Sequence, residues 1–587
     1  KIAYTATAAT IAVRLKDADA EGDMFYVAYD ADRQNPAEKR PLTFVVNGGP
    51  GAAAAYLHIL AFGPRIARLN GDGTIPAPPV AMEDNPLTWL AFTDLVFIDP
   101  VGTGYSKPLG DAKGADFWGV DQDIRSVGAF IKRYVSDNGR WASPKYILGE
   151  SYGGMRTAGV SYELLTKHNV ALNGIILVSP YLDFAGGNAG LNLTDGDVNF
   201  LPTFAATAWY HHALANRPVD LQPFLREAEA FAQDVYAPVL FKGARATAAE
   251  RQTVLAGLAR YTGLSADYWD KANLRTDEAH FLQELMRNKG VVAGRVDTRY
   301  TGGTLNALSE TMPYDPYGSA IAPAILATFN DYYRQELKVE SERPYVLSGG
   351  VGRDWDDRHN QPGVGRVPFA NTVVDLAHAM TINPKMKVLV QTGYFDLACP
   401  YRTAEYAIEH LAVAPAGLEQ RHEQVDEGRL LAAQDRLLER ERLHRGQRRV
   451  AGEQLAIPVI EQVLDHQAAH LVGRVPARPH RDVGHSRVER GVRVSPADRA
   501  GDLDGGAGAV GLVAGGVGAV VEHAILYVDQ PREHELGEQR GALRLVVHRL
   551  LPQAEEHAIG VDDLAALHER QPRVELLRPR ALDRQRG

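Results

Sequence analysis

Cysteine is almost absent from this chain, because Cys399 is its single cysteine among 587 residues. An internal disulfide is therefore excluded, although this alone does not fix the compartment in which the protein works. No apolar run reaches the roughly 18 residues that a membrane-spanning helix requires. The net charge of −10 is mild for this length and gives no reason to expect nucleic acid as a partner. The chain begins at Lys1 without a signal-peptide pattern, so we expect that a leader has been removed or that the sequence starts late.

Several residue types are missing from residues 417–587. All 17 Phe, 6 Trp and 7 Met precede this segment, which also has no Lys, Asn, Thr or Cys. Its composition indicates either a low-complexity tail or a reading-frame error near codon 417, and we favour the second interpretation. An intact reading frame through that codon would exclude the error.

Short apolar runs in residues 1–416 predict strands that are buried on both faces. They comprise residues 43–46, 95–98, 146–148, 175–178 and 388–390. Apolar residues at helical spacing predict helices over residues 120–134 and 155–165 between these runs. Because strands and helices alternate, we expect a mostly parallel central sheet covered by helices.

Residues 182–368 interrupt this alternation. They are mostly helical in pattern, as in residues 221–235 and 248–261, and we interpret them as a cap insertion over the sheet. We expect three of its aromatic side chains to be exposed: Trp209, Tyr210 and Trp269. The expected domains are the first part of the core (1–181), the cap (182–368), the second part of the core (369–416) and the atypical tail (417–587).

The sequence Gly-Glu-Ser-Tyr-Gly at residues 149–153 lies between a predicted strand and a predicted helix, which is the context of a nucleophile elbow. The turn is strained and needs small flanking residues, which Gly149, Gly153 and Gly154 supply. Such a turn presents the Oγ of Ser151 above the sheet, and the dipole of the following helix favours negative charge there. We therefore predict an α/β-hydrolase fold with Ser151 as its nucleophile. The alternative is an ordinary glycine-rich turn.

A second glycine-rich turn, Asn-Gly-Gly-Pro-Gly at residues 47–51, follows the first predicted strand. A tetrahedral intermediate needs backbone N–H donors aimed at its oxyanion. We expect the N–H of Tyr152 to be one donor and that of Gly49 to be the other. A tight structural turn is the alternative explanation.

Several motifs together resemble the serine carboxypeptidases, peptidase family S10. They are residues 47–51, 85–89 (Asn-Pro-Leu-Thr-Trp), 99–106 (Asp-Pro-Val-Gly-Thr-Gly-Tyr-Ser), 149–154 and 393–399 (Gly-Tyr-Phe-Asp-Leu-Ala-Cys). The resemblance covers about residues 1–416, and the single cysteine favours the bacterial branch of the family. It implies a secreted or periplasmic enzyme that removes amino acids from the free C-termini of peptides or proteins.

The resemblance also implies roles for individual residues. Ser151 would attack the last peptide carbonyl, Gly49 and Tyr152 would hold the oxyanion, and Asp396 would orient the catalytic histidine. Asp396 also follows a predicted strand, and the order Ser–Asp–His is that of the α/β-hydrolases. Asn47 and Glu150 would bind the substrate carboxylate. Because two adjacent carboxylates cannot both ionise cheaply, we expect an acidic pH optimum.

Three departures from the family pattern stand out. Ala61 replaces a second glutamate, and Val45 replaces a tryptophan near the substrate terminus. The Gly-His-Met motif that carries the catalytic histidine is absent from the whole chain. Four histidines are candidates for this role, and none can be assigned: His378, which we interpret as packing, and His444, His466 and His485.

Two further hypotheses therefore stay open: an acyltransferase or esterase on the same scaffold, and an inactive relative that lacks its base. The acidic run at residues 354–357 could suggest a metal, but clustered acids in a loop are usually a solvated surface. The pair His211-His212 has no third ligand at metal spacing. We expect no metal and no cofactor.

Overall fold

The computed structural model describes residues 2–15, 20–33, 39–70, 74–184, 186, 194–351 and 354–413, together with the strand Ala524–Val528. By its internal contacts, the chain divides into a unit of residues 1–427 and 515–587 and a second unit of residues 428–514. All described residues belong to the first unit. Apart from one strand, the expected tail therefore lies outside the described residues, as do His444, His466 and His485.

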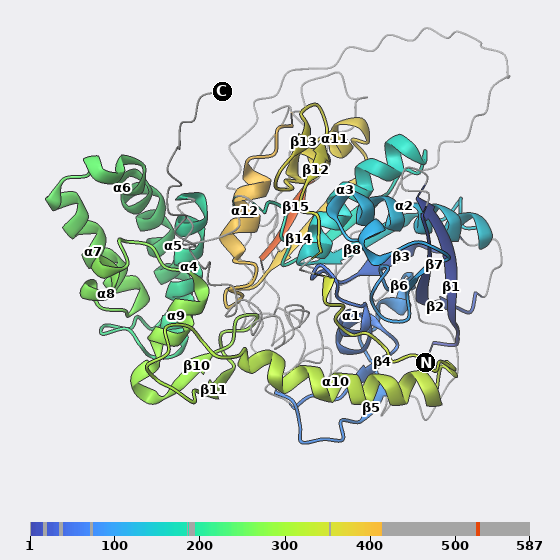
Figure 1. Ribbon diagram of the computed structural model, residues 1–587, viewed down its shortest axis with the longest axis horizontal. Helices are drawn as coiled ribbons and strands as arrows, with labels where there is room; N and C mark the ends of the chain where they lie inside the picture. The colour runs from blue at the N-terminus through green and yellow to red at the C-terminus, as the bar shows by residue number, and fades with distance from the viewer. Residues whose placement is uncertain are drawn as a thin grey trace, which may run out of the picture. The chain divides into compact units, whose positions relative to one another are not determined.

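A mixed sheet of nine strands forms the centre of the first unit (Figure 1). The order is β1-β2-β6-β3-β8-β9-β14-β15, and β7 pairs with β2. The strands are β1 (Tyr4–Leu15), β2 (Ala20–Ala31), β3 (Leu42–Val46), β6 (Asp94–Ile98), β7 (Lys107–Leu109), β8 (Lys145–Glu150), β9 (Gly174–Val178), β14 (Lys387–Thr392) and β15 (Ala524–Val528). The five strands from β6 to β14 are parallel, and the others are antiparallel to their neighbours. All five predicted strands lie within this parallel set.

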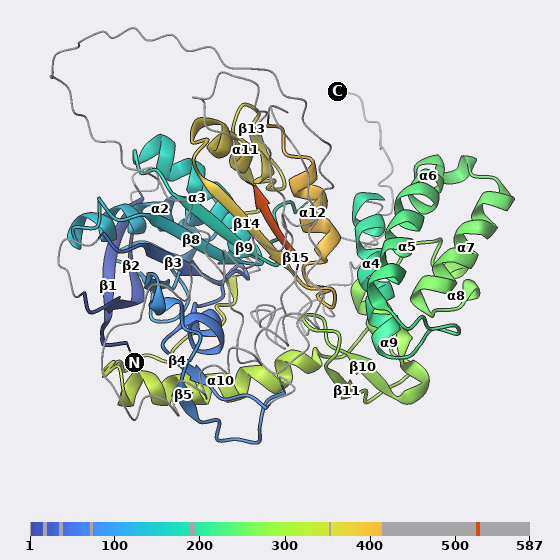
Figure 2. The same ribbon diagram turned by 180° about the vertical axis from the view of Figure 1, so that it is seen from behind.

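Burial explains why these parallel strands have continuous apolar sequences. Every residue of β3, β6 and β9 is buried. Helices α2 (Val120–Asp137), α3 (Tyr152–Lys167) and α11 (Val373–Ile382) pack side by side (Figures 1 and 2). Parallel strands covered by helices, with a sharp strand–turn–helix after β8, make the α/β-hydrolase fold. The predicted fold class is thus confirmed.

Six helices follow β9 and are drawn in green in Figure 1. They are α4 (Thr194–Tyr210), α5 (Leu221–Phe231), α6 (Ala237–Lys242), α7 (Ala248–Thr262), α8 (Ala266–Lys271) and α9 (Glu278–Leu285). Many of their apolar side chains pack in one buried cluster, which includes Phe204, Leu258 and Phe281. The expectation that Trp269 is exposed is wrong, because it is buried in this cluster and its Nε1 donates to Thr262 Oγ1 at 2.9 Å.

The remaining α-helices and short strands lie outside the nine-stranded sheet and these six helices. They are α1 (Ala55–Leu57), β4 (Arg65–Ala67), β5 (Met82–Asp84), β10 (Val291–Ala293), β11 (Thr301–Gly303), α10 (Pro316–Gln335), β12 (His359–Gln361), β13 (Gly365–Val367) and α12 (Tyr401–Glu409). The long helix α10 is anchored by buried hydrogen bonds between Tyr332 and Tyr29 at 2.7 Å and between Tyr333 and His58 at 3.0 Å. Within the described residues, no helix combines the length and apolarity needed to cross a bilayer.

Candidate active site

Ser151 occupies the sharp turn between β8 and α3. Its backbone has φ 53° and ψ −118°, a conformation that L-residues adopt only when the surroundings enforce it. Glycines make the turn possible: a Cβ on Gly149 would lie 2.0 Å from the carbonyl oxygen of Gly153, and a Cβ on Gly154 would lie 2.5 Å from Pro180. The strain and the close packing are those of a nucleophile elbow.

The turn at residues 47–51 lies directly beside this elbow. Strands β3 and β8 are neighbours, with Val46 paired to Gly149, so both turns leave the same edge of the sheet. Gly49 has φ +104°, and a Cβ there would lie 2.6 Å from the amide nitrogen of Gly51. Tyr152, the first residue of α3, is buried. The two residues expected to supply oxyanion donors therefore belong to adjacent turns.

Asn47 and Glu150 form a buried polar pair next to Ser151. Nδ2 of Asn47 donates to Oε2 of Glu150 at 2.9 Å, and both residues are at most 2% exposed. The amide of Leu57 donates to Oδ1 of Asn47 at 3.3 Å, which fixes the orientation of the Asn47 side chain. A carboxyl group and a carboxamide are therefore buried together next to Ser151.

Asp396 follows β14 and is 2% exposed. Its Oδ1 accepts hydrogen bonds from the amides of Ala398 and Cys399, each at 2.9 Å. Burial raises the pKa of Asp396 to about 7, although these amides and the charge of Arg295 act in the opposite direction. The same loop brings Sγ of Cys399 to 3.2 Å from Oγ of Ser151, and the thiol donates to the hydroxyl. Asp396 and Ser151 are therefore linked through the loop that ends at Cys399.

None of the histidines in the described part of the chain hydrogen-bonds to Ser151 or Asp396. His378 lies on α11, where its Nδ1 bonds to the carbonyl oxygen of Val374 at 3.0 Å and its ring packs edge-on to Tyr162. His58 is fully enclosed, and burial lowers its pKa to about 3. The ring nitrogens of His359 are both occupied by carboxylates, from Asp121 at 2.6 Å and Asp375 at 2.9 Å. A histidine for the site is not found among the described residues.

Two charged residues behind the elbow were not predicted from the sequence. Arg156 on α3 and Asp123 on α2 form a buried ion pair, with Nε 2.7 Å from Oδ2. Tyr152 donates its hydroxyl to the same carboxylate oxygen at 3.2 Å. One pattern in the sequence could have indicated this pair. Each residue is a charged side chain on the apolar side of its predicted helix, and charged side chains are rarely buried there unless they are paired.

The other family-like motifs support the turns around the site. Asn85 donates to the carbonyl oxygens of Ala61 and Gly63, each at 2.8 Å. Oδ1 of Asp99 accepts from the amide of Ala54 at 2.8 Å and from the hydroxyl of Tyr345 at 3.1 Å. Burial raises the pKa of Asp99 to about 7. These contacts fix the segment that follows the turn at residues 47–51.

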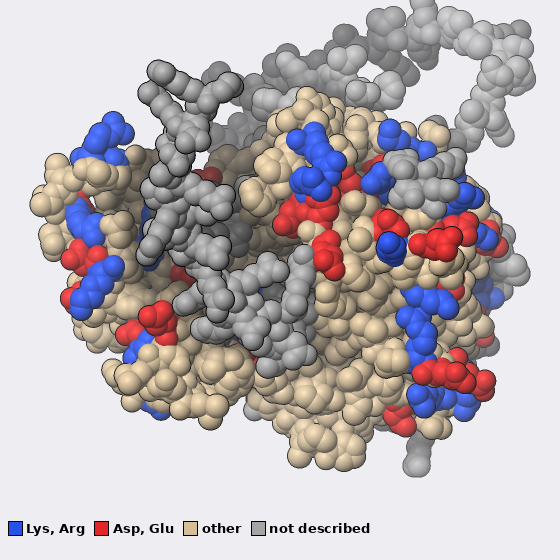
Figure 3. Space-filling view, in the orientation of Figure 1, with Lys and Arg blue, Asp and Glu red and all other residues tan. Residues whose placement is uncertain are grey.

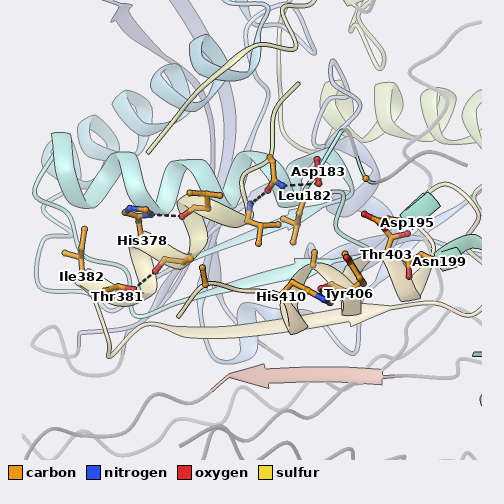
Figure 4. Close-up of a pocket in the computed structure, with 17 residues that line it drawn as sticks. Leu182, Asp183, Asp195, Asn199, His378, Thr381, Ile382, Thr403, Tyr406 and His410 are labelled. Carbon is orange, nitrogen blue, oxygen red and sulfur yellow. Dashed lines mark hydrogen bonds between the residues drawn. The ribbon is translucent and has the colours of Figure 1, made fainter. Parts of the chain in front are cut away.

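A cavity of about 460 Å³ lies between α11, α12 and the beginning of α4 (Figure 4). Asp183, His378, Thr403, Tyr406 and His410 are among the residues that line it, but Ser151 and Asp396 are not. It is therefore separate from the candidate active site.

Among the described residues, no group of three or more His, Cys, Asp or Glu side chains is placed to hold a metal ion. On the face shown in Figure 3, basic and acidic side chains are interspersed.

Residues 13–220 match the family model of the serine carboxypeptidases, peptidase family S10. Over 173 residues the chain is 25% identical to serine carboxypeptidase S10 family member 1 of Dictyostelium discoideum, covering 28% of this chain and 38% of that protein. Over 171 residues it is 32% identical to a pheromone-processing carboxypeptidase of Phytophthora infestans, covering 28% of this chain and 27% of that protein. The chain thus spans less than two fifths of these relatives.

Among solved structures, a prohormone-processing carboxypeptidase from Saccharomyces cerevisiae aligns with 71% of this chain and 81% of its own, at 16% identity and a TM-score of 0.42. The matches in sequence support the serine carboxypeptidase family over the matched segment.

Proposed function

We propose that this protein is a serine carboxypeptidase that releases C-terminal amino acids from peptides through an acyl-enzyme. The observation that carries the proposal is the buried pair of Asn47 and Glu150 beside Ser151. An enzyme that cleaves only the last peptide bond must recognise a free carboxylate next to its nucleophile. A protonated Glu150 donates a hydrogen bond to that carboxylate, and Asn47 holds Glu150 in place.

The proposed reaction follows from the placement of these groups. Oγ of Ser151 attacks the carbonyl carbon of the last peptide bond, and the amides of Gly49 and Tyr152 stabilise the oxyanion. The C–N bond then breaks, the free amino acid leaves, and water hydrolyses the acyl-enzyme. A base must take the proton of Ser151 and return it to the leaving amine, with Asp396 orienting that base. The base is not among the described residues, so the reaction depends on a histidine supplied from elsewhere in the chain.

A first experiment tests the nucleophile. The full chain is treated with a fluorophosphonate probe, alongside Ser151→Ala and the matched variant Ser161→Ala, which removes another buried hydroxyl from the same helix α3. We expect labelling of the wild type and of Ser161→Ala, and none of Ser151→Ala. Absence of labelling in the wild type would support the inactive relative, and labelling of Ser151→Ala would refute the assignment.

A second experiment tests the substrate class. A peptide with a free C-terminus is compared with the same peptide as its C-terminal amide, and the released amino acid or amino acid amide is measured. The pH runs from about 4 to about 8, a range that includes both the ordinary pKa of a carboxyl group and a raised one. The proposal requires release from the free acid, fastest at acidic pH. An equal rate on the amide, or acyl transfer from an ester without amino acid release, would favour the acyltransferase or esterase alternative.

We further propose that the protein belongs to the bacterial branch of the family and acts in a secreted or periplasmic compartment. The single cysteine supports the first point. The relatives compared above are eukaryotic, so the branch stays a prediction. Expression of the complete gene with fractionation of the cells is the test of the compartment.

A further inference from the structure

A buried ion pair lies directly beneath the two turns that form the candidate active site. Arg156 and Asp123 are 1% and 3% exposed, and their side chains meet at 2.7 Å. Burying two charges is costly, and well-packed apolar residues at such positions are often equally stabilising or better. A contribution to stability is therefore a weak explanation for this pair.

The contacts of the pair give a better explanation, because they reach both turns. Nη1 of Arg156 donates to the carbonyl oxygen of Asn47, the first residue of the turn at residues 47–51. Asp123 accepts a hydrogen bond from the hydroxyl of Tyr152. The amide of Tyr152 is expected to be an oxyanion donor, together with the amide of Gly49. The guanidinium also lies over the ring of Tyr152, 5.1 Å from its centroid. One ion pair thus contacts a residue of each turn.

The carbonyl group of Asn47 is also restrained from the side of the elbow. A Cβ on Gly153 would lie 2.9 Å from the carbonyl oxygens of Asn47 and Val46, so the two turns are in close contact. The turn then continues through a hydrogen bond from the amide of Ala52 to the carbonyl oxygen of Gly48 at 3.1 Å. A movement of the Asn47 carbonyl would therefore displace Gly49 relative to Tyr152.

We propose that Arg156, oriented by Asp123, is a positioning residue that holds the turn at residues 47–51 against Tyr152 and so sets the separation of the two oxyanion donors. The catalytic part of this inference rests on the proposed function, whereas the structural part does not. Arginine suits the role because its planar fork serves a carboxylate and a carbonyl oxygen at once, which a compact ammonium does less well.

The test uses the full chain with two variants of the pair. Arg156→Lys keeps a positive charge opposite Asp123 but replaces the fork. The double variant Asp123→Asn with Arg156→Met removes both charges together and leaves no unpaired buried charge. The matched control is Arg140→Lys, since Arg140 is also buried and ion-paired, with Asp94 at 2.8 Å, but contacts neither turn.

Two measurements separate the positioning role from the proposed function. Hydrogen exchange by mass spectrometry follows the amides of residues 47–57, and the rate of fluorophosphonate labelling follows Ser151. We expect faster exchange confined to residues 47–57 in both variants, and labelling of the double variant slowed about 100-fold, the effect of losing one oxyanion donor. Arg140→Lys should change neither exchange in this segment nor labelling.

Unchanged hydrogen exchange at residues 47–57 in the folded variants would overturn the inference. If the wild type is labelled, an unchanged labelling rate in the double variant would overturn it as well. If the wild type is not labelled, the proposed function fails, and the exchange measurement still decides whether Arg156 holds the turn.

Discussion

Replacing Asp396 by asparagine tests whether this carboxylate has a cationic partner in the full chain. In the described residues Asp396 is buried with two amide donors, and burial raises its pKa from 3.8 to about 7. A carboxyl group with a higher pKa in the folded than in the unfolded state destabilises the fold as the pH rises through that interval. The difference between the two pKa values lowers the free energy of unfolding by at most about 4 kcal/mol above pH 7.

The amide that Asp396→Asn introduces would stay neutral at every pH, and its Oδ1 would still accept from the amides of Ala398 and Cys399. Its new NH₂ group needs an acceptor in the same buried place, which reduces the gain. Because this cost does not depend on pH, we expect Asp396→Asn to be less stable than the wild type by about 2 kcal/mol near pH 4 and more stable by about 2 kcal/mol at pH 8.

Urea unfolding at about pH 4, 6 and 8, followed by tryptophan fluorescence, measures this difference. All 6 Trp lie in residues 1–416, so the signal reports on the part of the chain that contains Asp396. The control is Asp111→Asn, which removes a carboxylate that lies exposed in a turn. A constant difference across this pH range, or a loss of stability at the alkaline end, would refute the reasoning and indicate that a histidine or another cation pairs with Asp396.

Three further substitutions have defined outcomes. Glu150→Gln should weaken the acid dependence of amino acid release, because the amide of glutamine can donate a hydrogen bond without first taking up a proton. The measure is the ratio of kcat/KM at about pH 5 to kcat/KM at about pH 8, and an unchanged ratio contradicts this expectation. Burial lowers the pKa of His359, but Asp121 and Asp375 raise it to about 9, so His359→Gln should lose stability at pH 6 and much less above pH 9, as measured by Tm. Gly149→Ala should cost about 1–3 kcal/mol because of its overlap with Gly153, whereas Gly303→Ala, which meets nothing within 4 Å, should be neutral in the same assay.

The parallel strands and both glycine turns could be predicted because their causes are local. A strand buried on both faces must be apolar throughout, and a backbone turn such as that at Gly49 requires its own residue type. The hairpin of β1 and β2 was not predicted, because most of β1 is exposed or half-buried and its sequence is rich in alanine and threonine. Trp269 was placed wrongly because its burial depends on neighbouring helices that no local pattern specifies.

The ion pair of Arg156 and Asp123 depends on the same kind of non-local information. Each residue lies on the buried side of its own helix, but their contact arises only when α2 and α3 pack together. Sequence alone identified the groups expected to act on the substrate, whereas the groups that hold them emerged from the packing. Residue type thus indicates a chemistry for the site, which stays a prediction, and tertiary structure was needed to find the ion pair beneath it.

The contact between Cys399 and Ser151 defines what a catalytic histidine would have to change. Oγ of Ser151 now accepts a hydrogen bond from the thiol at 3.2 Å, whereas activation requires Oγ to donate its proton to a base. A thiol that donates to Oγ does not activate it. An imidazole acting on Ser151 must accept the hydrogen of Oγ through one nitrogen and donate to Asp396 through the other. Because Cys399 and Asp396 share one short loop, a base bound in this way would also partner the carboxylate whose burial now raises its pKa. The pH dependence of Asp396→Asn and the labelling of Ser151 should therefore change together: a chain that labels rapidly should show no gain of stability at alkaline pH, and a chain that gains stability should label slowly.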